Sequence, residues 1–189
     1  MQNISAIVLA AGLSSRMGRN KLMIPFGEST VIRHVVSVLA EAGLGEIVVV
    51  TGHEAGLVQG ALEGLPCRFV LNESFREGMG SSISSGVRAA SPDAEGFLIV
   101  LGDMPYLNSI LILQVGHIGQ TGRIVVPRHG GRWGNPVLFG AKSRGELESL
   151  SGDIGARDIL LRHADRLLFV EAESERTLED IDLPSDMQS

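Results

Sequence analysis

The sequence lacks the features that mark several large classes of protein. It contains a single cysteine, Cys67, so an internal disulfide is excluded. Its apolar runs all fall well short of the roughly 20 residues that a membrane-spanning helix needs. The first residues do not combine a basic start with the apolar core of a secretory signal. These absences predict a cytoplasmic protein that does not enter the membrane.

Positively charged residues are fewer than negatively charged ones. The chain has 16 Lys and Arg against 22 Asp and Glu, which gives a net charge of −6 at pH 7. Duplex nucleic acid is bound through a broad basic face, so nucleic acid is not an expected partner, and any bound anion must be held by a local cluster of Arg and Lys. The five histidines show no metal-ligand spacing: His34, His53, His117, His129 and His163.

Hydrophobic residues and glycines are plentiful, and their arrangement predicts the fold. The 189 residues are 44% hydrophobic and include 24 glycines, which is typical of one globular domain over residues 1–189. A helical pattern over residues 31–39 ends at Gly43. Near-continuous apolar runs predict strands that are buried on both faces, and therefore an α/β fold with a three-layer α/β/α sandwich and a mostly parallel, Rossmann-like sheet. The predicted strands are 4–10, 47–51, 68–71, 97–101, 124–127, 136–139 and 167–170.

The first predicted strand runs into the motif "VLAAGLSSRMGRNK" at residues 8–21. It lacks the G-x-G-x-x-G of dinucleotide-binding proteins, and Gly18 is followed by Arg-Asn-Lys instead of the Lys-Ser/Thr of a Walker loop. Small residues and a glycine turn beside Arg16 and Lys21 still favour an anion site, because free backbone N–H groups and cations face one ligand. The alternative is an ordinary strand-to-helix turn with solvated basic side chains.

Two further motifs follow later strands. Gly102-Asp103-Met104-Pro105 comes after "FLIVL", and its carboxylate is suited either to Mg²⁺ held against nucleotide phosphates or to stabilising a turn before the proline. The segment "EGMGSSISSGV" at 77–87 offers hydroxyls and amides that suit a helix cap or a nucleobase. Loops at the carboxyl ends of parallel strands meet at one edge of a sheet, so these motifs are expected to form one site.

Together these motifs resemble the MobA-like nucleotidyltransferases, and within them the molybdenum cofactor cytidylyltransferases. The resemblance continues through "GRWGNPVLFG", "LSGDIGARDIL" and "EDIDLPSDM", so it covers nearly the whole chain in the right order. It implies a fold of the nucleotide-diphospho-sugar transferase type. It also implies a Mg²⁺-dependent enzyme that moves CMP from CTP onto the phosphate of molybdopterin and releases pyrophosphate.

The resemblance also implies roles for individual residues. Arg16, Lys21 and Asp103 would be catalytic, with Arg16 on the departing pyrophosphate and Lys21 at the α-phosphate. Asp103 and Asp182 would hold the metal, with Asp180 as the alternative second ligand, because Leu183 replaces the threonine usual in this segment. The nucleotide would contact Leu9, Ala10, Ala11, Gly12, Leu13, Gly80, Ser81 and Ser82. The acceptor would contact His129, Arg132, Gly134, Asn135 and Pro136, with residues 151–157 nearby.

Ala11 bears on the choice of nucleotide. Guanylyl-transferring relatives commonly carry a second glycine at this position, so the resemblance favours CTP over GTP. The alternatives are a guanylyltransferase that makes molybdopterin guanine dinucleotide, transfer onto a sugar phosphate or another phosphorylated small molecule, and a catalytically inactive nucleotide-binding regulator. The partners implied are CTP or GTP, molybdopterin, and a molybdoenzyme or its chaperone.

Overall fold

The central element of the fold is a sheet whose strands are the apolar runs of the sequence. The computed structural model describes residues 1, 3–13, 20–119, 123–153 and 155–181. Within these residues, eight strands form one sheet in the order β10-β7-β9-β6-β1-β4-β5, with β8 paired to β7, while β2 and β3 form a small hairpin. The strands are β1 (Ile4–Ala10), β2 (Pro25–Phe26), β3 (Ser29–Thr30), β4 (Glu46–Thr51), β5 (Arg68–Leu71), β6 (Gly96–Leu101), β7 (Ile124–His129), β8 (Arg132–Trp133), β9 (Val137–Gly140) and β10 (Leu167–Glu171).

Most neighbouring strands of the sheet run parallel. β1 pairs in parallel with β4 and β6, β4 with β5, and β10 with β7. β9 is antiparallel to both β6 and β7, so the chain entering β9 lies at the same edge as the carboxyl ends of the parallel strands. This mostly parallel sheet confirms the predicted fold class, and the segment before β9 joins the edge where ligands bind in such sheets.

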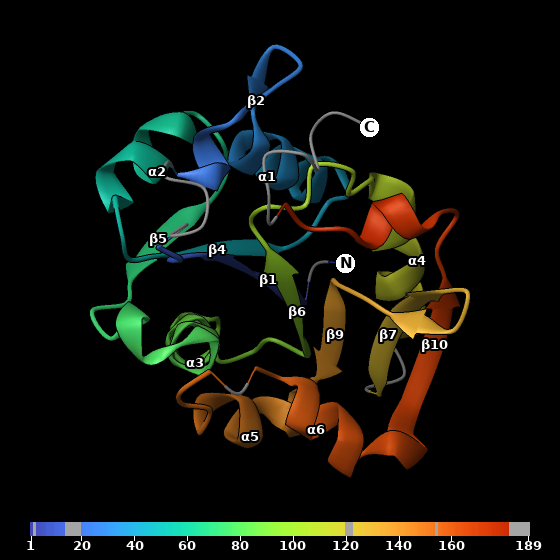
Figure 1. The fold of residues 1–189 in the computed structure, drawn as a ribbon. Coiled ribbons are helices and arrows are strands. Elements are labelled where there is room, and N and C mark those ends of the chain that lie inside the picture. The colour runs from blue at the N-terminus through green and yellow to red at the C-terminus, as the bar shows by residue number, and fades with distance from the viewer. Residues whose placement is uncertain (2, 14–19, 120–122, 154, 182–189) are drawn as a thin grey trace.

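Helices cover both faces of the sheet (Figure 1). One face carries α1, α2 and α4, and the opposite face carries α3, α5 and α6. The helices are α1 (Val31–Glu41), α2 (Ala55–Ala61), α3 (Met79–Ala89), α4 (Ser109–Gly119), α5 (Arg144–Glu148) and α6 (Arg157–Arg162), with short 3-10 turns η1 (Lys21–Met23), η2 (Phe75–Glu77), η3 (Ala141–Ser143), η4 (Ala164–Arg166) and η5 (Glu175–Leu178).

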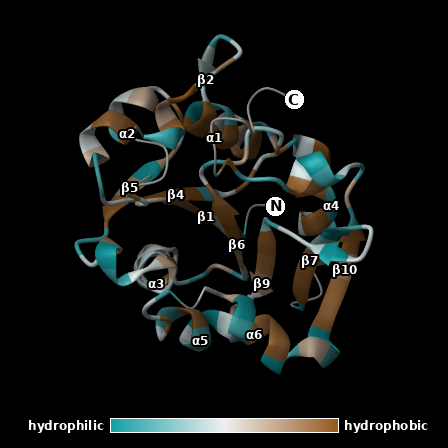
Figure 2. Cartoon of the chain, viewed as in Figure 1, coloured by the Kyte–Doolittle hydropathy of each residue, from teal (hydrophilic) through white to brown (hydrophobic). Residues whose placement is uncertain are grey.

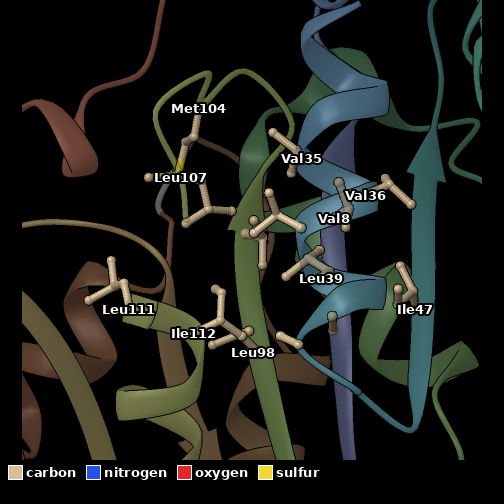
Figure 3. Packing of buried hydrophobic residues seen from close by; sticks show 14 of the residues in the cluster. Val8, Val35, Val36, Leu39, Ile47, Leu98, Met104, Leu107, Leu111 and Ile112 are labelled. Carbon is tan, nitrogen blue, oxygen red and sulfur yellow. The ribbon is translucent and has the colours of Figure 1, made fainter. Parts of the chain in front are cut away.

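Two hydrophobic cores lie on the two faces, because successive side chains of a strand point to opposite sides. In β1, Val8 packs with α1 and α4, whereas Ile7 packs with α3. Figure 2 shows the strands as the apolar centre of the molecule, and Figure 3 shows Val8, Leu98 and Leu39 meeting between the sheet and α1. Burial on both faces explains why the strand sequences are continuously apolar.

The predicted strands are confirmed, with small differences at their ends. β7 continues to His129 because its last residues pair with β8 in a short hairpin. β9 begins at Val137 and not at the expected Pro136, which has no N–H to donate to a sheet. Gly43 follows α1 with a φ of +72°, as the helix-ending glycine predicts. No helix within the described residues is long and apolar enough to cross a membrane.

Gly86 lets α3 lie directly against the sheet. A Cβ at this position would come within 2.3 Å of Ile7 Cγ2 and 2.8 Å of Val50 Cγ2, which belong to β1 and β4. Both side chains are fully buried, so neither has room to move away. The glycine therefore sets the distance between α3, which contributes to the site described below, and the strands that end there.

We expect Gly86→Ala to destabilise the protein. The clash should lower the free energy of unfolding by about 1–3 kcal/mol. The better helix propensity of alanine should offset up to about 1 kcal/mol of this loss. The matched control is Gly60→Ala in α2, where a Cβ meets nothing within 4 Å, and this variant should gain up to about 1 kcal/mol. Chemical denaturation of the three proteins measures both effects, and equal stabilities of the two variants would contradict the close-packing argument.

Candidate functional site

A cleft of about 310 Å³ opens at the carboxyl edge of the central strands. The end of β1 and the following Gly12 line it, together with Leu101 at the end of β6 and Asp103 just after it. η2 and α3 contribute Phe75, Met79 and Ser82. Lys21, Leu22 and Asp180 complete it. The three motifs therefore meet in one place, as the parallel topology predicts.

Lys21 and Asp103 form an ion pair at the centre of this cleft. Asp103 is buried, and Lys21 Nζ also donates a hydrogen bond of 2.8 Å to the carbonyl oxygen of Ile181. The Ile181 N–H in turn donates to the Asp103 carbonyl oxygen at 3.0 Å. Three segments far apart in the sequence are thus joined around Lys21 and Asp103.

Ile181 is the apolar anchor of this arrangement. Its side chain is 1% exposed and packs with Ile24 and Val31, with Phe26 of the β2–β3 hairpin alongside. Because the anchor fixes the backbone at residue 181, the preceding Asp180 is placed at the cleft. This small cluster therefore holds residues 180 and 181 at the edge of the sheet where the cleft opens.

The charged residues that line the cleft among the described residues are Lys21, Asp103 and Asp180. Burial raises the pKa of the Asp103 carboxyl, the Lys21 ammonium lowers it, and the negative charge of Asp180 raises it, with a net upward direction. Burial is the largest of these causes, and by formal charge the cleft has two carboxylates, Asp103 and Asp180, against the one ammonium of Lys21. A site of this kind stabilises an additional cation.

The donor set fits a magnesium ion that is shared with phosphates. Mg²⁺ prefers oxygen ligands and is usually held by one or two carboxylates together with substrate phosphates. Asp103 and Asp180 supply such carboxylates at one cleft. Within the described residues, no group of three or more His, Cys, Asp or Glu is placed to hold a metal, so a cage made of protein ligands alone is not seen there.

Ala11 lines the cleft through the segment that follows β1. It is 4% exposed, and its methyl group faces Gly52, where an added Cβ would lie 2.9 Å from Ala11 Cβ and 2.7 Å from Phe75 Cβ. Gly52 thus allows Phe75 and Ala11 to approach each other and close a small apolar corner. Such a corner suits the flat face of a base more than a phosphate.

The hydroxyl groups at the start of α3 have different environments. Asn72 is buried and donates to both Ser81 Oγ and Ser82 Oγ, at 2.9 and 3.0 Å. Ser81 Oγ also contacts the carbonyl oxygens of Ser74 and Gly78, so its hydroxyl stabilises the turn. Among the described residues, Ser82 Oγ has the Asn72 amide as its hydrogen-bond partner, and Ser82 lines the cleft. Ser82 is therefore the hydroxyl available to a ligand.

A second, larger cavity of about 620 Å³ adjoins the cleft, and we call it the distal cavity. Met79 and Leu101 line both, so the two spaces meet there. Three predicted acceptor residues, Arg132, Gly134 and Asn135, line the distal cavity. They also line a smaller pocket that contains His129 and Asp180. His129 Nδ1 lies 3.0 Å from the Ala172 carbonyl oxygen, which makes Nδ1 the protonated ring nitrogen.

The structure thus brings together many of the predicted site residues. Leu9, Ala10, Ala11, Gly12, Lys21, Ser82 and Asp103 line one cleft. Other predicted residues do not line it: Leu13 is 42% exposed beside it, the Gly80 N–H donates to Gly152 O, and Pro136 follows a cis peptide bond after Asn135. Arg16 and Asp182 lie outside the described residues, so the roles implied for them stay predictions.

Several lining residues have no counterpart among the predicted ones. Phe75 and Met79 line the cleft, and Trp133 and Leu161 line the distal cavity. Some signal for them was present in the sequence. Met79 follows the glycine that opens the α3 motif, and Trp133 is the single tryptophan of the chain inside the motif "GRWGNP".

Residues 6–167 match the family described as the MobA-like NTP transferase domain. Among curated relatives, nicotine blue oxidoreductase of Paenarthrobacter nicotinovorans is 30% identical over 97% of this chain and 94% of its own length. Molybdenum cofactor cytidylyltransferase of Escherichia coli is 28% identical over 98% of this chain and 94% of its own. These relatives carry names for different reactions, so family membership leaves the substrate open.

Comparison with solved structures also indicates a nucleotidyltransferase fold. A nucleotidyl transferase from Methanothermobacter thermautotroptrophicus superposes with a TM-score of 0.86 and 30% identity, covering 98% of this chain and 94% of that one. Rv0371C from Mycobacterium tuberculosis, solved in complex with manganese, gives a TM-score of 0.78 and 26% identity, covering 98% and 96%. The fold is therefore that of nucleotidyltransferases, and one similar protein binds a divalent metal.

We expect Ile181→Ala to destabilise the protein because it removes the anchor of the C-terminal segment. Truncating a buried isoleucine costs about 2–5 kcal/mol, and this small cluster should give a value near the lower end. Ile181→Val should cost about 0.5–1.5 kcal/mol. Leu161→Ala is the control, because this side chain is 59% exposed and its loss should change stability little. Denaturant melts give the three values, and an Ile181→Ala variant as stable as wild type would argue against the anchor.

Proposed function

Because this chain belongs to the MobA-like NTP transferase domain family, we propose that it is a Mg²⁺-dependent nucleotidyltransferase that moves CMP from CTP onto the phosphate of molybdopterin. The observation that carries the proposal is the cleft in which Lys21, Asp103 and Asp180 converge beside the small residues that end β1. The near full-length similarity to a molybdenum cofactor cytidylyltransferase supports the choice of substrates.

The reaction joins two anions. An oxygen of the acceptor phosphate attacks the α-phosphorus of CTP, a new P–O bond forms, and the bond from the α-phosphorus to the bridging oxygen breaks as pyrophosphate leaves. The attacking phosphate is already ionised at neutral pH, so the reaction needs no general base. Catalysis then consists mainly of positioning and charge neutralisation.

The residues of the cleft are suited to that task. Lys21 sits beside the buried Asp103 and brings a positive charge to the place where the α-phosphate would lie. Asp103 and Asp180 would hold Mg²⁺, which supplies Lewis-acid neutralisation of the phosphates when it is bound. Arg16 would hold the departing pyrophosphate, as the resemblance implies. The adjoining distal cavity would receive the acceptor, since it opens onto the cleft at Met79 and Leu101.

The proposal is tested by measuring pyrophosphate release with CTP, GTP, ATP and UTP, each with and without molybdopterin. We expect release only when CTP and molybdopterin are both present together with Mg²⁺, and none from an Asp103→Asn variant. GTP as the preferred substrate would assign the protein to guanylyl transfer. Release with a sugar phosphate in place of molybdopterin would assign another acceptor, and no release with any pair would overturn the transferase proposal.

Lys21→Ala should lower kcat far more than it raises KM for CTP. Charge at the α-phosphate matters most when negative charge develops in the transition state, and removing one such group typically costs about 10²- to 10³-fold in kcat. Steady-state kinetics separates the two constants. Lys142→Ala replaces the other lysine of the chain, which is exposed in η3, and should behave as wild type. An effect of Lys21→Ala confined to KM would contradict this role.

Ala11→Gly should narrow the preference for CTP over GTP. The buried Ala11 methyl faces Gly52 and takes up space that a larger purine needs, and such packing effects are worth about 1–3 kcal/mol, or about 10- to 200-fold. The double variant Ala11→Gly/Ser82→Ala also lacks the hydroxyl that lines the cleft. Its preference for CTP over GTP should be narrower still. The ratio of kcat/KM for CTP and GTP measures both steps. An unchanged ratio in Ala11→Gly would show that the Ala11 methyl is not the basis of nucleotide selectivity.

A further inference from the structure

Glu54 has a backbone conformation that residues with a side chain rarely adopt. Its φ of +51° and ψ of +38° lie in the left-handed region, and no other non-glycine residue among those described has a positive φ. Because this conformation crowds the Cβ of every residue except glycine, it costs free energy and persists only where the surrounding structure enforces it. The Glu54 side chain therefore needs a role that glycine could not fill.

This residue lies at the edge of the sheet where the cleft opens. β4 runs parallel to β1 and ends at Thr51, and Glu54 is the N-cap of α2. The N–H of the preceding His53 donates to the Ala11 carbonyl oxygen at 3.4 Å, which ties this segment to the end of β1. Within α2, all of which is described, the Glu54 carboxylate caps no backbone N–H. The helix itself therefore does not explain the glutamate.

The Glu54 carboxylate instead contacts the turn that carries Lys21. Asn20 Nδ2 donates a hydrogen bond of 3.0 Å to Glu54 Oε2, and His53 Nε2 lies 3.9 Å from the same oxygen. Asn20 is the N-cap of η1, and its Oδ1 accepts a hydrogen bond of 3.1 Å from the Leu22 N–H. The Asn20 amide thus links Glu54 to η1, whose first residue is Lys21.

η1 depends on such contacts for its orientation. It has three residues, and a 3-10 turn of this length has poor hydrogen-bond geometry of its own. The buried Leu22 side chain packs in the core, α2 lies against the turn, and Asn20 caps it. A lysine side chain has four rotatable bonds, so its ammonium stays at one place only if its backbone is held.

We propose that Glu54 is a positioning residue, which acts through Asn20 to hold η1 and thereby the Lys21 ammonium at the cleft. This inference deepens the proposed function, on which it rests for the catalytic role of Lys21. Glutamate occupies a position that favours glycine because its carboxylate reaches Asn20. Backbone strain at the end of β4 is thus retained in exchange for order at Lys21.

Substitutions at Glu54 separate the side chain from the backbone conformation. Glu54→Gln keeps an oxygen that accepts from Asn20, whereas Glu54→Ala and Glu54→Gly both lose it. Stability should follow the backbone, so Glu54→Gly should have a higher denaturant midpoint than Glu54→Ala. The position of Lys21 should follow the hydrogen bond, so these two variants should be equally impaired. Glu63→Ala is the matched control, because it removes an exposed glutamate just beyond the other end of α2.

The position of Lys21 can be measured without any substrate, because Lys142 is the other lysine of the chain and serves as an internal reference. Acetic anhydride labelling followed by mass spectrometry gives the rate at Lys21 relative to that at the exposed Lys142. Loss of the hydrogen bond should raise this ratio about fivefold in Glu54→Ala and Glu54→Gly. Glu54→Gln and Glu63→Ala should keep the wild-type ratio. A wild-type ratio in Glu54→Ala would overturn the inference.

An exchange of the two partners tests whether Glu54 acts through Asn20. Asn20→Asp keeps an oxygen for the Leu22 N–H but places a second carboxylate against Glu54, so it should raise the labelling ratio as Glu54→Ala does. The double variant Asn20→Asp/Glu54→Gln should restore the ratio, because the introduced amide donates to the introduced carboxylate. A double variant as impaired as Asn20→Asp would contradict a path through this hydrogen bond.

Kinetic measurements then connect this position to turnover. With CTP and molybdopterin, Glu54→Ala and Glu54→Gly should lower kcat about fivefold with little change in KM, and Glu54→Gln should stay near wild type. A loss of kcat that follows stability instead of the hydrogen bond would overturn the inference. If the labelling ratio responds as expected but no pyrophosphate is released, the positioning of Lys21 stands and the proposed reaction is wrong. If pyrophosphate is released but the ratio does not respond, the reaction stands and the positioning role is wrong.

Discussion

The contact between Lys21 and the buried Asp103 is the interaction on which the rest of the site depends. A carboxylate at the end of a central strand is costly to bury, and here a second carboxylate, Asp180, adds to that cost. The protein offsets part of it with one ammonium and with backbone hydrogen bonds to Ile181. By formal charge the two carboxylates exceed the one ammonium, so the cleft suits a metal ion, and a metal ion held there would offset the charge of a bound phosphate. Stability and function therefore oppose each other at this point.

Apolar side chains that do not line the cleft keep this arrangement in place. Ile181 is held by a small apolar cluster, and this contact places Asp180 although the isoleucine side chain does not line the cleft. On the opposite face, Gly86 lets α3 approach β1 and β4, which sets the position of Ser82 and Met79. The geometry of the site is thus determined by two hydrophobic contacts on opposite sides of the sheet.

The sequence was sufficient to predict the strands, the sheet type and the meeting of Lys21 with Asp103, because apolar runs and strand ends follow simple periodic rules. It was not sufficient to predict which of the Ser81 and Ser82 hydroxyls is available to a ligand. These neighbours have the same chemistry, and only the packing of Asn72 and the turn carbonyls commits the Ser81 hydroxyl to the protein. Phe75 and Trp133 were not among the predicted site residues for a related reason. An aromatic side chain lines a cavity only through tertiary contacts, such as the close approach allowed by Gly52.

The same topology that joins the motifs also places the cleft and the distal cavity side by side. β9 runs antiparallel to β6, so the segment before β9 reaches the edge at which β1 and β6 end. The cleft and the distal cavity share the lining residues Met79 and Leu101, with Lys21, Asp103 and Asp180 on the cleft side and Trp133 on the other. In the proposed reaction, a nucleotide and an acceptor that entered from these two sides would bring their phosphates together at the shared wall. Two mutually repelling anions would then meet beside Lys21 and the carboxylates that would hold the metal.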